Sequence, residues 1–305
     1  MTKNNSASAL ESIGPTAVGN QHAVPYNLPH HLPDEPLVII EPSQSWPRLD
    51  FREVWTYREL LYFLVWRDIK VRYKQTALGV VWVVMQPLLT TLLFTLILGR
   101  LVGIASDGIP YALFVYAGML PWTFFASAVT SSSNSLVGNS HLITKVYFPR
   151  VLIPVAAIAA RLLDLAVAFA VLIVLMVYYR VAMGPGILML PVYVALVMLF
   201  ALALGMLSSA LNVKYRDVAV MIPFLFQLWM FASPVVYPSS LVPGKWRWLY
   251  ELNPMAGIIE GFRSALFGRG FDWPGLATST IIILVMLVGA SFLFRRMQSS
   301  FADIV

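Results

Sequence analysis

The ionisable side chains of this sequence are few, and their spacing does not assemble an acid–base or metal site. The chain has no cysteine, which excludes thiolate ligands, cysteine nucleophiles and disulfides. Three of its four histidines, His22, His30 and His31, lie in a proline-rich segment without a carboxylate cluster, so we expect no metal site there. Three further acidic residues are scattered, each beside an arginine: Glu59, Asp68 and Asp217. A membrane enzyme would need such carboxylates gathered together.

One charged pair stands inside an otherwise apolar run. Arg161 and Asp164 are three residues apart, and Arg161 lies about 16 Å along a helix from Arg150. An ionisable residue at that depth in a membrane is costly and usually paired or functional. Residues at this spacing can neutralise each other on one helix face. We predict a buried ion pair; the alternative is that Arg161 contacts a substrate phosphate.

Aromatic side chains form a second pattern. Tyr111, Phe114, Trp122 and Phe125, with Gly118 between them, recur at helical spacing over four turns. Sugars present flat C–H faces that stack on aromatic rings, so this stripe could line a conduit for a glycan. The alternative is helix packing or anchoring at a membrane interface, where Trp and Tyr are enriched.

The elements that carry these residues are long apolar runs. Of the 305 residues, 59% are hydrophobic and only 12% are charged, about half the charged share of a soluble domain. A helix needs about 20 mostly apolar residues to cross a bilayer. Six runs are long enough: Leu78–Val102, Tyr111–Val137, Val151–Tyr179, Ile187–Leu211, Val218–Val236 and Leu276–Phe294. We therefore predict an all-α integral membrane protein with six transmembrane helices in a domain over residues 77–296.

Residues 55–76 precede the first run and predict an amphipathic interface helix. Tyr62, Trp66, Ile69 and Tyr73 form one stripe at helical spacing. A second, basic stripe lies about 100° away and consists of Arg67, Lys70 and Lys74. An aromatic face beside a basic face suits a helix in the headgroup plane. The helix either anchors the first span or also docks a cytoplasmic partner.

The loop over residues 138–149 predicts a short helix. Asn139 or Ser140 can cap its start, and Pro149 sets its end. Four of its residues are apolar: Leu142, Ile143, Val146 and Phe148. Such a helix either lies on the membrane or inserts into a socket of a soluble partner.

The remaining segments indicate topology. Residues 1–54 are proline-rich and poor in large apolar residues, so we expect a mostly disordered tail without a cleavable signal peptide. If this tail is cytoplasmic, the segments on its side of the membrane carry Lys and Arg at about twice the density of the segments on the opposite side. Because cytoplasmic segments carry the excess of Lys and Arg, we predict that both termini, including residues 297–305, lie inside the cell. No nucleic-acid partner is indicated by the net charge of +6.

Residues 238–275 are too polar to span, and they form either an ordinary external loop or two short helices that dip into the outer leaflet. Trp246 and Trp248 suit the headgroup level. Asn253-Pro254 opens a second helical piece, with Glu260 and Arg263 three residues apart.

Six motifs in one order resemble the membrane subunit of ABC exporters for bacterial cell-surface polysaccharides, the O-antigen, capsule and teichoic-acid permeases. The resemblance extends from about Trp55 to Arg296. The motifs are WRDIKVRYKQTALGVVWVVMQPLL (Trp66–Leu89), AGMLPWTFF (Ala117–Phe125), LITKVYFPR (Leu142–Arg150), LNVKYRDV (Leu211–Val218), SPVVYP (Ser233–Pro238) and LNPMAGIIEGFRSALFG (Leu252–Gly268).

The resemblance implies export of a lipid-linked polysaccharide across the bacterial inner membrane by a homodimer with two copies of a soluble ATPase subunit. ATP and Mg²⁺ would bind that partner, and this chain has no G-x-x-x-x-G-K-[ST] phosphate loop. The resemblance also implies that residues 238–275 form external gate helices. The implied ATPase contacts are Arg67, Lys70, Lys74, His141, Leu142, Ile143, Lys145 and Phe148. The rival classes are a secondary transporter, which would need midplane coupling carboxylates, and a membrane enzyme acting on lipid-linked sugars.

Overall fold

The computed structural model describes residues 55–74, 79–104, 106, 108–145, 148–298 and 301. The proline-rich tail, its three histidines, and Val146 of the loop helix lie outside these residues. Within the described part of the chain the secondary structure is helical.

Five helices of the described residues are long and apolar enough to cross a membrane. This finding confirms the all-α membrane fold. The first is α3 (Gly79–Phe94), which continues as the π-helix η1 (Thr95–Val102). The others are α4 (Tyr111–Gly138), α6 and α7 together (Leu152–Tyr178), α8 (Leu190–Lys214) with the preceding 3₁₀ turn η2 (Pro185–Met189), and α12 (Trp273–Gln298).

The sixth apolar run forms a shorter helix than the sequence predicts. Helix α9 covers Val218–Ala232, whereas the prediction extends to Val236. Ser233 precedes Pro234 and adopts an extended conformation, because a residue before proline avoids helical geometry. The 15 residues of α9 give a length of about 22 Å at 1.5 Å per residue.

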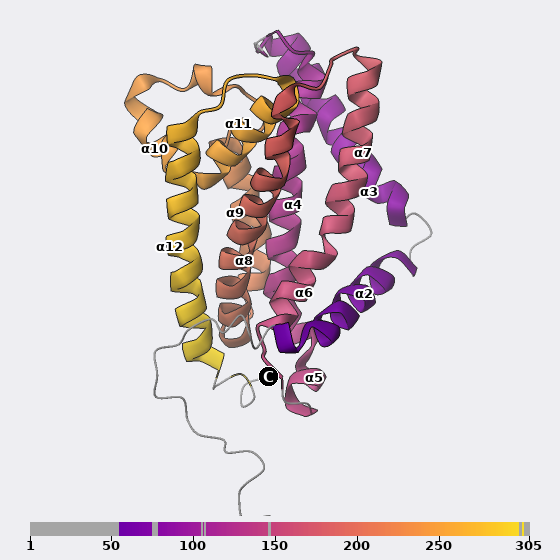
Figure 1. The fold of residues 1–305 in the computed structure, drawn as a ribbon, viewed down its shortest axis with the longest axis vertical. Helices are drawn as coiled ribbons and strands as arrows, with labels where there is room; N and C mark the ends of the chain where they lie inside the picture. The colour runs from indigo at the N-terminus through magenta and orange to yellow at the C-terminus, as the bar shows by residue number, and fades with distance from the viewer. Residues whose placement is uncertain are drawn as a thin grey trace, which may run out of the picture. The chain divides into compact units, whose positions relative to one another are not determined.

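The third predicted span is interrupted at its charged residue. Helix α6 (Leu152–Ala160) ends at Arg161, and α7 (Leu162–Tyr178) begins directly after it. The Arg161 amide donates to the carbonyl of Ile158, three residues back, at 3.0 Å. This tight turn gives α6 and α7 different directions (Figure 1).

Helix α4 lies at the centre of the bundle and contacts α3, α6, α7, α8, α9 and α11. Its small residues allow close approach: a Cβ on Gly205 of α8 would lie 2.6 Å from the Ser132 hydroxyl of α4. Such contacts between small residues are typical of helix packing in membranes. As a result, most side chains of α4 are buried on every face of the helix.

The two ends of the bundle carry different short elements (Figure 1). At one end α2 (Arg58–Lys74) runs obliquely beneath α6, near α5 (Ser140–Lys145) and the C-terminal end of α12. At the other end lie α10 (Arg247–Glu251) and α11 (Pro254–Phe267). The 3₁₀ turns η3 (Ser239–Leu241) and η4 (Gly244–Trp246) precede α10 in the chain.

Candidate functional site

A charged cluster joins α2 to the break between α6 and α7. Asp164 accepts a hydrogen bond from Arg72 Nη1 at 2.6 Å and one from the Tyr73 hydroxyl. Arg161 Nη1 lies 3.3 Å from the same Asp164 oxygen that binds Arg72. On its other side Arg161 donates through Nε to the Ser131 hydroxyl of α4 at 2.8 Å. The predicted pair is therefore part of a larger group, which we call the Arg72–Asp164–Arg161 cluster.

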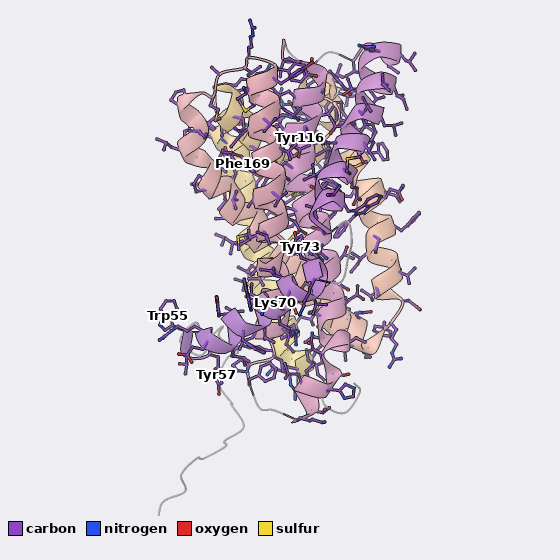
Figure 2. The ribbon with its side chains drawn as sticks, turned by 90° about the vertical axis from the view of Figure 1, so that its right-hand side faces the viewer. Trp55, Tyr57, Lys70, Tyr73, Tyr116 and Phe169 are labelled. Carbon is purple, nitrogen blue, oxygen red and sulfur yellow. The ribbon has the colours of Figure 1, made fainter. Side chains whose placement is uncertain are left out.

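The oblique course of α2 supplies two members of this cluster. Leu64 is fully buried against α6 and fixes the side of α2 that faces the bundle. Arg72 lies eight residues further along α2 and about 80° around the helix axis from Leu64. In Figure 2 Tyr73 lies against the bundle, whereas Trp55, before the start of the helix, lies outside it. Burial and the hydrogen bond to Asp164 raise the pKa of Tyr73 to about 12, so its hydroxyl remains a donor at neutral pH.

Two cavities meet at this cluster. The first has a volume of about 790 Å³ between α3, α4, α7 and α9, and its walls are mainly aromatic and aliphatic. We call it the apolar cavity; it is bordered by Trp82, Trp122, Phe124, Phe226 and Met230, among others.

The second cavity, of about 710 Å³, lies between α2, α4 and α6, and we call it the polar cavity. Hydroxyl and amide groups border it: Thr130, Ser131, Asn134, Ser135 and Asn139, with Arg67 and Asp68 from α2. Arg72, Thr130 and Arg161 border both cavities.

Within one chain the aromatic stripe of α4 does not border a single cavity, and its role in lining a conduit stays a prediction. Of its members only Trp122 borders the apolar cavity, beside the off-stripe Phe124. Phe125 is fully buried and stacks on Phe200 of α8, with ring centroids 4.8 Å apart. Phe114 is buried beneath Arg263, and the Tyr111 hydroxyl donates to the carbonyl of Val236 at 2.7 Å. The physical reason is that other helices cover most of α4 and leave only part of it beside the two cavities.

Each of the two stripes predicted on α2 contains both exposed and partly buried side chains. Tyr62 and Trp66 are exposed, while Ile69 and Tyr73 are partly buried, so the predicted aromatic stripe does not face one environment. Lys70 and Lys74 are exposed, and Lys70 Nζ lies over the Trp66 ring at 5.4 Å. Arg67 is half-buried and pairs with Asp68 at 2.8 Å.

Two of the five expected contact residues in and after α5 are turned inward. Ile143 and Phe148 are buried in a core cluster with residues of α2, α4, α6, α8 and α12. These two residues therefore pack inward within one chain, and their contact with an ATPase subunit stays a prediction. His141 and Lys145 are exposed, and Leu142 is half-buried.

The segment between α9 and α12 contains the helices α10 and α11, and Asn253 fixes where α11 begins. Its side-chain oxygen accepts from the Met255 amide at 3.1 Å and from Trp229 Nε1 of α9 at 3.2 Å. Pro254 occupies the first helical position, where a missing N–H costs nothing. Trp246 and Trp248 are exposed, as expected for rings at a membrane surface.

Arg263 of α11 is buried, and its guanidinium donates to three backbone carbonyls. Its Nη1 and Nη2 donate to the carbonyls of Pro234 and Val235, each at 2.6 Å, and its Nε donates to the carbonyl of Phe114 at 3.2 Å. Its guanidinium carbon lies 3.6 Å from the Phe114 ring centroid. Glu260 accepts from the Tyr250 hydroxyl at 3.2 Å. Arg263 thus holds α11 to α4 and to the irregular segment after α9.

Sequence reasoning missed Arg72, Tyr73 and Ser131 as neighbours of the buried pair. No local pattern of α2 marks Arg72, which lies about 80° around the helix axis from the buried Leu64.

Comparison with known proteins adds a family. The family described as ABC-2 type transporter matches residues 59–267. The O-antigen export system permease protein RfbA of Myxococcus xanthus is 29% identical over 256 residues, covering 83% of this chain and 97% of the relative. A Klebsiella pneumoniae protein of the same name is 30% identical over 253 residues, which cover 81% of this chain and 95% of that protein. The polysialic acid transport protein KpsM of Escherichia coli is 25% identical over 231 residues, which cover 72% of this chain and 86% of that protein.

Proposed function

Because this chain belongs to the ABC-2 type transporter family, we propose that it is the membrane permease of an exporter for a lipid-linked cell-surface polysaccharide. The observation that carries the proposal is similarity over nearly the whole length of an O-antigen export permease, including 97% of the Myxococcus xanthus protein. A second relative of lower identity is a polysialic acid transport protein, so both substrates named among these relatives are glycans.

The energy for export comes from a separate ATPase subunit in this proposal. The chain contains no phosphate-binding loop motif, so ATP and Mg²⁺ would bind the partner. The docking surface would be formed by the exposed basic residues at one end of the bundle: Lys70 and Lys74 of α2, and His141 and Lys145 of α5. Leu142, half-buried beside them, adds apolar contact area.

The same end of the bundle would face the cytoplasm of the bacterial cell. It carries Arg150, whose side chain donates to the carbonyl of Gln298 at the end of α12. Further basic residues at helix ends here are Lys145, Lys214, Arg295 and Arg296. Cytoplasmic segments carry the excess of Lys and Arg. With α10 and α11 at the opposite, external end, both termini would lie inside and the chain would cross the inner membrane.

We further propose a homodimer with two ATPase subunits. Helix α3 buries little of its apolar surface within one chain, and Trp82, Leu89 and Leu93 are among its exposed side chains. Helix α9 likewise exposes Phe224, Leu228 and Phe231. Lipid or a second copy must cover these faces. A conduit between two copies would leave the aromatic stripe of α4 in its packing role.

The proposal is tested by purification and complementation. The tagged permease is co-expressed with a candidate ABC ATPase subunit, and co-elution and surface polysaccharide are measured in a strain that lacks its own permease. The double variant His141→Asp with Lys145→Asp is expected to reduce co-elution and export while normal yield is kept. The matched control is Lys245→Asp at the other end of the bundle. Export without any co-eluting ATPase would overturn the proposal, and a secondary transporter would then be the better description.

A further inference from the structure

We propose that the Arg72–Asp164–Arg161 cluster binds the phosphate group of an amphiphilic substrate whose apolar chain lies in the apolar cavity and whose sugar lies in the polar cavity. This inference rests on the proposed function and adds the place where the lipid-linked substrate is held. It assigns a role to groups that the packing of α2 against the bundle does not require.

The first argument is charge. The cluster brings two guanidinium groups together around one carboxylate beside the membrane interior. The side chains of Arg161 and Asp164 are 20% and 15% exposed, so water screens their charges only partly. Two guanidinium groups this close together attract an anion more strongly here than in bulk water. A phosphate group bound between the two arginines would interact favourably with both.

The second argument is preorganisation. The Ser131 hydroxyl accepts from Arg161 and fixes the plane of its guanidinium, while Asp164 holds Arg72 at 2.6 Å. Arginine is well suited to phosphate because its planar fork of N–H donors matches two oxygens at once. The Tyr73 hydroxyl donates to the second oxygen of Asp164 and keeps this carboxylate in place. The two arginines therefore lie close together before any ligand arrives.

The third argument is the order of surfaces. Moving along the bundle, the walls change from aromatic and aliphatic in the apolar cavity, to cationic at the cluster, to hydroxyl and amide groups in the polar cavity. A lipid-linked saccharide has the same order of parts: hydrocarbon, phosphate and sugar. Volumes of about 790 and 710 Å³ also fall within the range of about 300–1,000 Å³ that is common for ligand pockets.

Binding is measured on the purified full-length permease with farnesyl diphosphate as the probe. Thr130→Cys places a single thiol at the border of both cavities in a chain that has no other cysteine. The rate of maleimide labelling at this thiol is followed as the probe is added. We expect farnesyl diphosphate to protect the thiol from labelling. Farnesol should protect it less because it lacks the phosphate groups, and inorganic pyrophosphate should protect it weakly because it lacks the hydrocarbon chain.

Variants in the Thr130→Cys background separate the roles of the charges. Arg72→Gln and Arg161→Gln are each expected to weaken binding about tenfold to a hundredfold, because each removes charge-assisted hydrogen bonds to phosphate. Arg161→Lys should retain part of the affinity. Asp164→Asn should bind the probe more tightly than the parent, because it removes the competing anion. Arg100→Gln, on the exposed part of η1 and outside both cavities, is the control.

The opposite outcomes overturn the inference. If folded Arg72→Gln and Arg161→Gln variants bind farnesyl diphosphate as the parent does, the cluster only ties α2 to α7. If phosphatidylglycerol protects the thiol as well as farnesyl diphosphate does, the site takes ordinary lipid headgroups, and the inferred substrate role is lost. These results leave ATPase co-elution and export untouched, so failure of the site is distinguishable from failure of the proposed function.

Discussion

Replacement of Arg263 by methionine is expected to release α11 from the rest of the bundle. The change removes three hydrogen bonds from one guanidinium to the carbonyls of Phe114, Pro234 and Val235, and leaves those oxygens without these donors. Each charged hydrogen bond contributes about 1.5–3 kcal/mol, but burying the guanidinium offsets part of the sum. Loss of one partner from a buried charged network typically costs about 3–5 kcal/mol, and we expect this magnitude.

Arg263→Lys tests the geometry of the guanidinium. A lysine keeps the charge, but its single nitrogen cannot reach three carbonyls that lie in different directions. We therefore expect Arg263→Lys to lose stability as well, by less than Arg263→Met. Gly118→Ala perturbs the same place from α4, because a Cβ there would lie 2.4 Å from Arg263 Nη2 and 2.7 Å from the Val235 oxygen. Overpacking of this kind costs about 1–3 kcal/mol.

Hydrogen exchange read by mass spectrometry on the purified permease is the suitable assay, because it reports local opening. Faster exchange is expected in residues 233–236 and in α11, with little change in α12. The melting temperature of Arg263→Met should also fall by at least about 6 °C. Unchanged exchange in α11 for both Arg263 variants would refute the reasoning, since the three carbonyl contacts would then contribute nothing to its position.

Three further changes have clear expected outcomes. Asp164→Ala should lower the yield of folded protein. Adding Arg72→Ala should restore more of that yield than adding Arg161→Ala, because Arg72 lies 2.6 Å from the carboxylate and Arg161 lies 3.3 Å from it. Equal restoration of the yield would contradict this ranking. Phe125→Ala should cost about 3–5 kcal/mol, seen as a lower melting temperature, with normal export at matched yield, because this ring packs on Phe200; export loss in a fully stable variant would return it to a conduit role. Gly261→Ala should prevent correct folding in a size-exclusion assay, because its Cβ would lie 2.0 Å from the Tyr193 ring, whereas Gly289→Ala, with open space around it, should be tolerated.

The helices and their order could be predicted from the sequence because length and apolar content are local properties. The apolar runs gave the bounds of α4 and α12 to within a few residues. The end of α9 was misplaced, although Ser233-Pro234 carries a local signal for it. Hydropathy alone outweighed that signal, since Val235 and Val236 continue the apolar run.

The site could be predicted only in part because its contacts join distant segments. The spacing of Arg161 and Asp164 suggests a pair. Tyr73, however, is 91 positions away from Asp164 in the sequence, and no local sequence pattern predicts a contact at that separation. The aromatic stripe shows the same limit from another side. Helical periodicity places Phe114, Trp122 and Phe125 near one another on α4, but it does not say which helix covers them. Within one chain the neighbours of α4 cover Phe114 and Phe125, which the stripe alone does not predict.

The short length of α9 has a consequence for the surrounding lipid. A helix of about 22 Å falls about 8 Å short of a hydrocarbon layer of about 30 Å. Such a mismatch is relieved by local thinning of the bilayer, at a cost of fractions of a kcal/mol per Å. The bilayer beside α9 would therefore be thinned in the resting protein. A hydrophilic substrate that moves past α9 would then cross a thinner hydrocarbon layer. Reconstitution into lipids of increasing acyl length should slow transport progressively, even where the protein itself stays fully folded.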